Sequence, residues 1–164
     1  MSLSPDRRTL LVIQLQSLPS IAELAEPELK LAGYRIKPTT FGPSRAWSAV
    51  SLRLQAVDGG DERDVTGLPE AARLGNFGWS PDGRRFLFTN TTAEGIELWV
   101  GEIGDAKARR LVGPRLNLCT GLSPAWLADS ETILAPLVPA DAGEPPAASP
   151  VPRGPTVQEN LGRK

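Results

Sequence analysis

Few residues of this chain have the types and spacing that enzyme chemistry requires. The sequence contains no histidine and one cysteine, Cys119, which removes Ser-His-Asp and Cys-His arrangements, internal disulfides and cysteine zinc clusters. The Gly-x-Ser-x-Gly, Gly-x-Gly-x-x-Gly and Gly-x-x-x-x-Gly-Lys-Ser/Thr motifs do not occur in it. Carboxylates and lysines remain, but no pattern among them indicates a reaction. We therefore predict no catalytic residue, no cofactor-binding residue and no metal ligand, and we expect no activity from this chain alone.

Acidic residues come nearest to the pattern of a metal site. Asp82 and Asp129 recur at equivalent places, and the segment 58–64, DGGDERD, carries four acidic residues. That segment lacks the glycine and glutamate spacing of an EF-hand and falls where a hairpin turn is expected. An aspartate in a turn commonly bonds its own backbone. We interpret all three features as turn chemistry, with cation binding as the alternative.

The four tryptophans could line a ligand groove or pack in a core. Trp79, Trp99 and Trp126 recur at fixed places in a repeat described below, which favours packing. Trp47 borders an insertion, and both interpretations stay open there. Cys119 is expected to be a small buried hydrophobic residue.

A strong turn signal interrupts the most apolar segment of the chain. Trp-Ser-Pro-Asp-Gly, residues 79–83, has the proline, aspartate and glycine that a tight β-turn favours. It predicts a hairpin in which Phe86 and Phe88 lie on one face and Leu87 lies on the other. Two further turns follow, and together they predict an up-and-down sheet. Its expected strands are 75–79, 85–90, 96–100 and 109–112.

The same pattern recurs along the chain. Segment 51–67 aligns with 97–113, and segment 79–88 aligns with 126–135, at shifts of 46 and 47 residues. The segment 3–13 is a third copy of the hairpin. A four-stranded unit with this period is typical of a β-propeller blade, and blades stack face to face. The sequence thus predicts an all-β fold: a partial, open β-propeller of about three four-stranded antiparallel blades with a short helical insertion. An unrelated β-sandwich is the alternative.

Two segments break the period. In an insertion at 17–46, Ile21, Leu24 and Ala25 have helical spacing, which predicts a short helix over about 20–25, followed by an irregular excursion. Six prolines fall between 139 and 155, a composition typical of an extended loop or linker. We therefore predict a partial propeller over 1–138, interrupted at 17–46, and a proline-rich loop and tail over 139–164.

Composition argues against nucleic acids and membranes as partners. The 164 residues carry a net charge of −1, which argues against a nucleic-acid partner. No apolar run reaches the roughly 18 residues of a membrane-spanning helix, and the N-terminus lacks the pattern of a signal peptide. The sequence as written therefore predicts no membrane partner and a cytoplasmic location.

Several segments together resemble one peptidase family. The hairpin WSPDGRRFLF is similar to the repeat shared by TolB-type propellers and by serine peptidases of the prolyl oligopeptidase (S9) family. A wider set of segments resembles the N-terminal propeller of the glutamyl endopeptidase branch of that family, in the same order along nearly the whole chain. These segments are SLSPDRRTLL, SLPSIAELAEPELKLAGYRI, GNFGWSPDGRRFLFTNTTAEGIELWV, RRLVGPRLN and VPRGPTVQEN.

The resemblance implies a two-domain peptidase, in which a propeller gates peptide entry and a C-terminal α/β-hydrolase domain carries the Ser-His-Asp triad. No position here matches the nucleophile, the acid or the base, so no catalytic residue is carried over. Ala128 and Ser130 depart from the pattern, because they replace the proline and glycine of the third turn.

The chain is therefore expected to be a non-catalytic fragment, whose partners are the missing hydrolase domain and, in the parent enzyme, peptides. A fragment of a propeller leaves its first and last blades uncovered, so we expect it to associate or aggregate. The alternative is a free-standing, TolB-like propeller module that binds other proteins.

Overall fold

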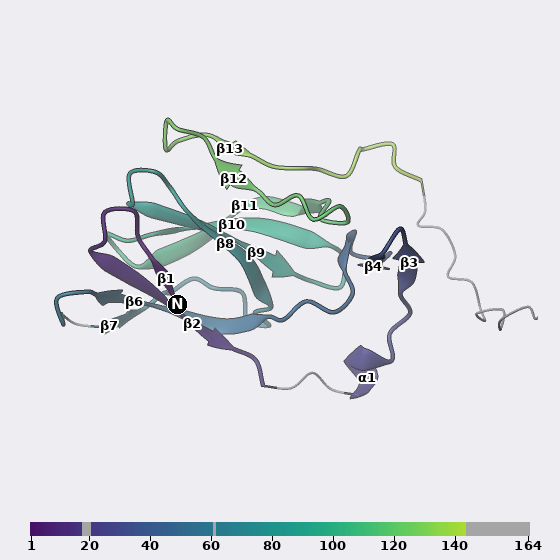
Figure 1. The fold of residues 1–164 in the computed structure, drawn as a ribbon, viewed down its shortest axis with the longest axis horizontal. Coiled ribbons are helices and arrows are strands. Elements are labelled where there is room, and N and C mark those ends of the chain that lie inside the picture. The colour runs from purple at the N-terminus through teal and green to yellow at the C-terminus, as the bar shows by residue number, and fades with distance from the viewer. Residues whose placement is uncertain (18–20, 61, 144–164) are drawn as a thin grey trace, which may run out of the picture.

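The computed structural model describes residues 1–17, 21–60 and 62–143. Within that part of the chain the structure is all-β, and its helix, α1, spans only Ile21–Leu24. Most strands belong to two four-stranded antiparallel units, called here the first unit and the second unit (Figure 1). The all-β prediction is confirmed.

The first unit is built from residues on both sides of the insertion. Its strands, in spatial order, are β1 (Ser2–Leu3), β2 (Thr9–Leu15), β6 (Ala49–Ala56) and β7 (Glu62–Asp64). Leu11 pairs with Leu54, and Ile13 pairs with Leu52. Because side chains alternate along a strand, these four form one apolar face.

The second unit is a meander of four consecutive strands. They are β8 (Leu74–Trp79), β9 (Arg85–Thr91), β10 (Ile96–Glu102) and β11 (Lys107–Leu116). Each predicted strand is present, and the strands extend beyond the predicted bounds. A single register pair, Ala49 with Leu74, joins this unit to the first.

A shorter ladder follows the second unit. β12 (Ala125–Trp126) pairs with β13 (Ile133–Leu134) and forms what we call the third hairpin. In the described residues it has two strands, so the number of four-stranded blades stays a prediction.

The core lies in two layers, one on each side of the second unit. Phe86 and Phe88 pack with the apolar face of the first unit in one cluster. Leu87 belongs to a second cluster, which Trp126 and Ile133 of the third hairpin help to cover. The three parts therefore stack one upon another, as the ribbon shows (Figure 1). The predicted division of the β9 side chains between two faces is confirmed, and the stack has three layers where a sandwich has two.

Three turns share the same geometry: the first turn of the first unit, the first turn of the second unit and the turn of the third hairpin. In each, a backbone N–H donates to the carbonyl three residues earlier, at 2.9, 2.9 and 3.1 Å, and the donor residue has a left-handed φ of 61°, 71° and 59°. The donor–acceptor pairs are Arg7–Ser4, Gly83–Ser80 and Ser130–Leu127. The third turn therefore forms despite its replaced proline and glycine.

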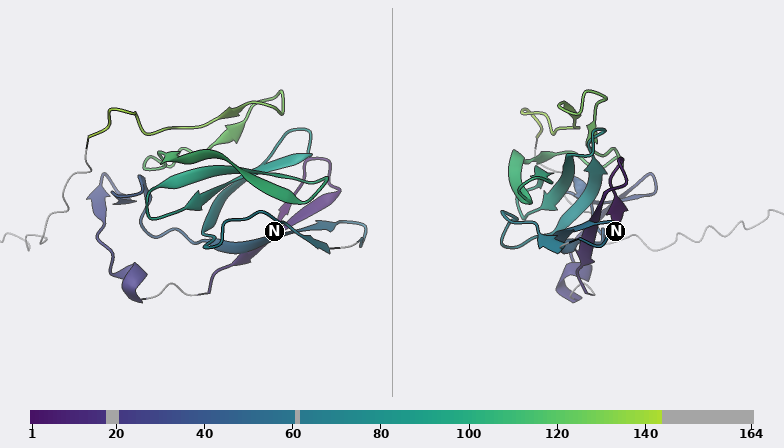
Figure 2. Two further views of the ribbon diagram at one scale, coloured as in Figure 1. Left: turned by 180° about the vertical axis from the view of Figure 1, so that it is seen from behind. Right: turned by 90° about the vertical axis from the view of Figure 1, so that its left-hand side faces the viewer.

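The insertion forms a small substructure of its own. After α1 it contains a three-stranded antiparallel sheet of β3 (Leu29–Leu31), β4 (Tyr34–Lys37) and β5 (Gly42–Pro43). The expected irregular excursion is therefore wrong, whereas the short helix is confirmed with narrower bounds. The insertion lies at the end of the sheets opposite to the three turns (Figure 2). Of the predicted tail, 144–164 lies outside the described residues.

Candidate functional site

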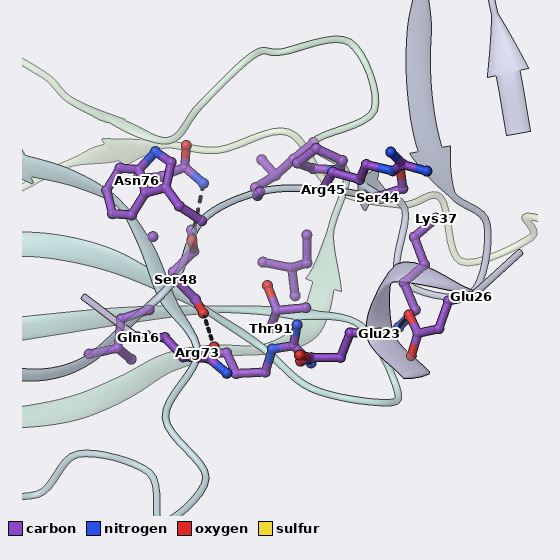
Figure 3. A pocket seen from close by; sticks show the side chains of 18 of the residues that line it. Gln16, Glu23, Glu26, Lys37, Ser44, Arg45, Ser48, Arg73, Asn76 and Thr91 are labelled. Carbon is purple, nitrogen blue, oxygen red and sulfur yellow. Dashed lines mark hydrogen bonds and ion pairs between the residues drawn. The ribbon is translucent and has the colours of Figure 1, made fainter. Parts of the chain in front are cut away.

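A cleft of about 680 Å³ separates the insertion from the second unit (Figure 3). One wall comes from the insertion, where α1 contributes Glu23 and Leu24 and β4 contributes Lys37. The opposite wall comes from the strand ends of the second unit, and it includes Leu74 and Thr91. A volume of this size lies within the range of ligand sites, about 300–1,000 Å³.

The cleft opens where β6 of the first unit and β8 of the second unit separate. β6 and β8 pair only at Ala49 and Leu74, and the residues that follow on β8, Gly75 and Asn76, line the cleft. On the side of β8 that faces β6, no other strand pairing is present in the part of the chain that the structure describes. β8 bulges at this place, because its pairing with β9 is irregular between Gly75 and Gly78 and Asn76 has a left-handed φ of 48°.

An aromatic side chain forms part of the wall beside this bulge. Trp47 is 62% exposed, and its ring stacks on Phe77 with a centroid separation of 6.3 Å. Phe77 stacks in turn on the fully buried Phe88, also at 6.3 Å. The exposed indole is thus supported from the core.

The charged groups of the cleft occur in ion pairs. Glu23 of α1 lies 3.0 Å from the guanidinium of Arg73 across the cleft (Figure 3). Lys37 pairs with Glu26, and Arg45 lies 3.4 Å from Glu28. The cleft therefore presents balanced charge at its rim and mostly apolar and neutral polar groups within.

A second pocket of about 480 Å³ adjoins the cleft and contains the buried carboxylate of Glu97. Asn90, Trp99 and Arg110 donate hydrogen bonds to its oxygens at 3.0, 2.8 and 2.8 Å. Burial raises the pKa of Glu97, but these hydrogen bonds lower it by more, so the pKa lies below its ordinary value. Glu97 is held as a carboxylate by neighbours on three strands.

The three tryptophans predicted to pack are partly buried and pack against the two core clusters, and Trp99 also lines the second pocket. Trp79 and Trp126 in addition link neighbouring parts of the stack. The indole N–H of Trp79 donates to Ser2 Oγ at 3.0 Å, and that of Trp126 donates to the Gly78 carbonyl at 3.2 Å. Each therefore connects its own strand to the part stacked before it. Trp99 stacks on Phe88 at 6.1 Å within the first cluster.

The predicted turn aspartates bond their own backbone. Asp82 accepts from the Arg84 N–H at 3.1 Å and from the Ser80 hydroxyl at 2.6 Å. Asp129 accepts from the Thr132 hydroxyl at 2.6 Å and from its N–H at 2.9 Å. Hydrogen bonds from Ser80 and Thr132 lower the pKa of these carboxyls. Turn chemistry accounts for both residues.

Neither a metal site nor a membrane-spanning helix is found in the described residues. In residues 1–17, 21–60 and 62–143, no cluster of three or more potential metal-ligating side chains occurs, 58–60 and 62–64 included. No helix in these ranges is long and apolar enough to cross a membrane. Cys119 was predicted to be buried, whereas it is half-buried; this partial burial raises the pKa of its thiol.

Sequence reasoning did not find the cleft. Its residues come from separated stretches of chain between Gln16 and Leu118, and no motif connects them. The sequence signal for it is Trp47, which borders the insertion and is compatible with both groove lining and core packing.

Comparison with known proteins places the chain in a family. No family model matches it. It is 32% identical to a probable chloroplastic glutamyl endopeptidase of Oryza sativa subsp. japonica over 171 aligned positions, and 30% identical to one of Arabidopsis thaliana. Each alignment covers 98% of this chain and 18% of the relative. A solved structure of Pyrococcus horikoshii acylaminoacyl peptidase covers 55% of this chain and 13% of that chain, with 18% identity and a TM-score of 0.37.

The similarity to the two plant proteins extends through the insertion and both repeated units, because almost no part of the chain falls outside the alignments. The resemblance found in the sequence is thus confirmed at the level of the family. The chain spans less than a fifth of the length of these relatives. It belongs to the glutamyl endopeptidase branch of the prolyl oligopeptidase (S9) family of serine peptidases.

Proposed function

We propose that this chain is a non-catalytic propeller segment of a serine peptidase of the prolyl oligopeptidase family, and that it gates peptide access to a C-terminal α/β-hydrolase domain. The observation that carries the proposal is the similarity to two glutamyl endopeptidases over 98% of the chain. The sequence has no histidine, so a Ser-His-Asp triad must be completed elsewhere.

The stacked architecture supports the propeller part of the proposal. The second unit is covered on both faces, and equivalent tryptophans, Trp79 and Trp126, link successive parts. Successive four-stranded sheets with repeated contacts are the construction of a β-propeller. A stack that is packed on both faces of its central unit could form part of the wall that a size filter for peptides requires.

A chimera tests this function. The segment of the rice relative that aligns with this chain would be replaced by the chain itself. We expect the chimera to hydrolyse a short glutamyl chromogenic peptide and to discriminate against intact casein, as the unmodified relative would. The isolated chain should hydrolyse neither substrate and should not react with a fluorophosphonate probe.

The control is the same relative with a flexible linker in place of the segment. Loss of size discrimination in this control and its return in the chimera support gating. A chimera that cleaves casein as fast as the linker control does would exclude it. Stoichiometric labelling of a serine in the isolated chain would contradict the non-catalytic assignment.

A further inference from the structure

We propose that α1 is a movable flap over the cleft, and that the ion pair between Glu23 and Arg73 holds it in the closed position. The helix contributes Glu23 and Leu24 to one wall of the cleft, and Arg73 lines the cleft from the second unit. Figure 3 shows the two charged side chains meeting across the space between them. The inference concerns the insertion and goes beyond the proposed gating by the propeller.

The first argument is that α1 has little apolar contact to fix its position. Ile21 is 86% exposed and Leu24 is 50% exposed, and neither core cluster contains a described residue of this helix. The helix has four residues, whereas isolated helices shorter than about 12–15 residues are marginal in water. The position of α1 therefore depends on polar contacts.

The second argument is that Arg73 is fixed on the second unit. Its backbone N–H donates to Asn90 Oδ1 at 3.0 Å, and its carbonyl accepts from the Thr91 N–H, also at 3.0 Å. Both partners lie on β9, a strand that contributes to the two core clusters. At 3.0 Å from Arg73, Glu23 thus connects a weakly packed helix to a firmly held arginine.

The third argument is that the small sheet of the insertion is anchored without the help of α1. The Leu118 N–H donates to the Phe41 carbonyl at 2.8 Å, and Gly42 of β5 lies so close to Ile96 that an added Cβ would collide with it. The ion pair of Lys37 with Glu26 keeps the end of the helix beside β4. Opening would therefore swing α1 about residues 26–28, and the sheet would stay in place.

The ion pair is strong enough to bias the flap and weak enough to release it. The side chains of Glu23 and Arg73 are 24% and 42% exposed, so water weakens their attraction. Pairs of this kind favour one state over another by about fivefold at most. At 1 M salt the Debye length falls to about 3 Å, and most of this bias should disappear. Ionic strength would thus control how often the cleft opens.

Distances between two spin labels, measured by pulsed electron paramagnetic resonance, test the proposal on the full chain. The labels are attached at Ile21→Cys on α1 and at Glu94→Cys in the loop between β9 and β10, both exposed positions. Cys119→Ser removes the native thiol. At low salt we expect one predominant distance. At 1 M sodium chloride a longer distance should gain population, with a rise of about two- to fivefold in the ratio of open to closed molecules.

Substitutions assign the effect to the ion pair. Arg73→Gln should populate the longer distance at low salt, and the charge exchange Glu23→Arg with Arg73→Glu should restore the shorter one. Arg53→Gln is the matched control, because the pair of Arg53 with Glu62 on the first unit also measures 3.0 Å and is similarly exposed, and its loss should leave the distances unchanged. Thermal melts establish that each variant is folded. If Arg73→Gln does not fold, the salt series on the labelled chain decides.

Distances that change neither with salt nor with Arg73→Gln would overturn the proposal, because α1 would then be a fixed wall of the cleft. An equal response to Arg53→Gln, or a charge exchange that leaves the longer distance in place, would also overturn it, since the effect would not belong to this pair. A fixed α1 leaves the gating proposal standing, and the chimera can fail while the flap responds to salt, so the two failures are distinguishable.

Discussion

Individual residues carry most of the specific polar chemistry in this molecule, and Glu97 is the clearest case. Its carboxylate is buried and accepts three side-chain hydrogen bonds. Glu97→Gln should reduce the free energy of unfolding by about 1–3 kcal/mol at neutral pH, because an amide cannot accept all three bonds and leaves Arg110 without its anion. Urea unfolding measures this, with the exposed Glu94→Gln as control.

The same variant gives a pH dependence with a definite sign. The pKa of Glu97 is lowered in the folded state from an ordinary value of 4.5. Its stabilising contribution is therefore complete above that ordinary value and is lost as the pH falls through the folded pKa. The difference in unfolding free energy between wild type and Glu97→Gln should be constant near neutrality and should shrink in acid. A difference that grows in acid would contradict the assignment.

Gly83 shows how a turn residue acts through its backbone. Its φ of 71° is strained for β-branched residues, and an added Cβ would lie 3.4 Å from Asp6 Cγ. Gly83→Val should cost about 1–3 kcal/mol, whereas Gly143→Val, in open space, should cost within about 0.5 kcal/mol. Because Ser130 adopts this conformation in the third turn, Gly83→Ser should cost less than Gly83→Val. Equal urea midpoints for the two valine variants would contradict this.

Sequence reasoning succeeded where a residue acts within its own turn. Asp82 and Asp129 bond residues two or three positions away, and such local bonds follow from residue type. It did not find Glu97, whose partners Asn90, Trp99 and Arg110 lie on three different strands. Their proximity depends on strand register, which the turn motifs alone do not determine.

Among the elements, the third hairpin has two register pairs of its own and is joined to the second unit by contacts of Trp126 and Ser130, so its stability can be tested separately from that of the second unit. Trp126 donates to Gly78, and the Arg85 guanidinium lies 5.3 Å from the Trp126 ring. Trp126→Ala should remove both contacts and open the hairpin locally. Hydrogen exchange should then become faster over β12 and β13, and protection over β9 and β10 should persist.

Leu134→Ala is the control for that experiment, because it shortens an exposed side chain on the same hairpin and should leave exchange unchanged. Equal loss of protection in β9 and in the hairpin would show that the stack unfolds as one cooperative body.

The elements that the sequence predicted share an apolar periodicity and a turn motif. The hairpin of β8 and β9 has both. The small sheet of the insertion has neither, since its strands contain two to four residues. Polar contacts around Glu28 join its parts, including a hydrogen bond of 2.8 Å from Ser44 and ion pairs with Arg35 and Arg45. Such non-local polar pairing leaves no period in the sequence.

For the molecule as a whole, the structure changes the expectation about its two outer faces. An open propeller predicts an uncovered apolar face on both its first and its last blade. On the outward face of the first unit, Leu10 and Val12 lie beside polar residues of β2 and β6. The polar residues are Gln14, Ser51, Arg53 and Gln55, of which Gln14 bonds Ser51 at 2.8 Å and Arg53 pairs with Glu62 at 3.0 Å. A polar outer face is a common feature of terminal units in repeat proteins.

The third hairpin, by contrast, exposes leucine side chains, so we expect molecules to associate there. Leu134 is 68% exposed on β13, on the side away from Ile133, which packs in the second cluster. Leu122, Leu127 and Leu137 in the same region are also exposed. Exposed leucines favour association, because each Å² of apolar surface that is buried contributes about 25 cal/mol. The chain should therefore associate through the third hairpin rather than through the first unit.

Size-exclusion chromatography with light scattering tests this over a range of protein concentrations. The wild-type chain should exceed its monomer mass of 17.5 kDa as concentration rises. Leu134→Lys should shift it toward the monomer, because a lysine ammonium resists burial. Val57→Lys, at an exposed position of the first unit, adds the same charge and should leave association unchanged. Equal effects of the two lysines would mean that net charge, and not the hairpin face, controls association. A wild-type chain that stays monomeric at every concentration would show that the exposed leucines are too few, or too dispersed, to drive contact between molecules.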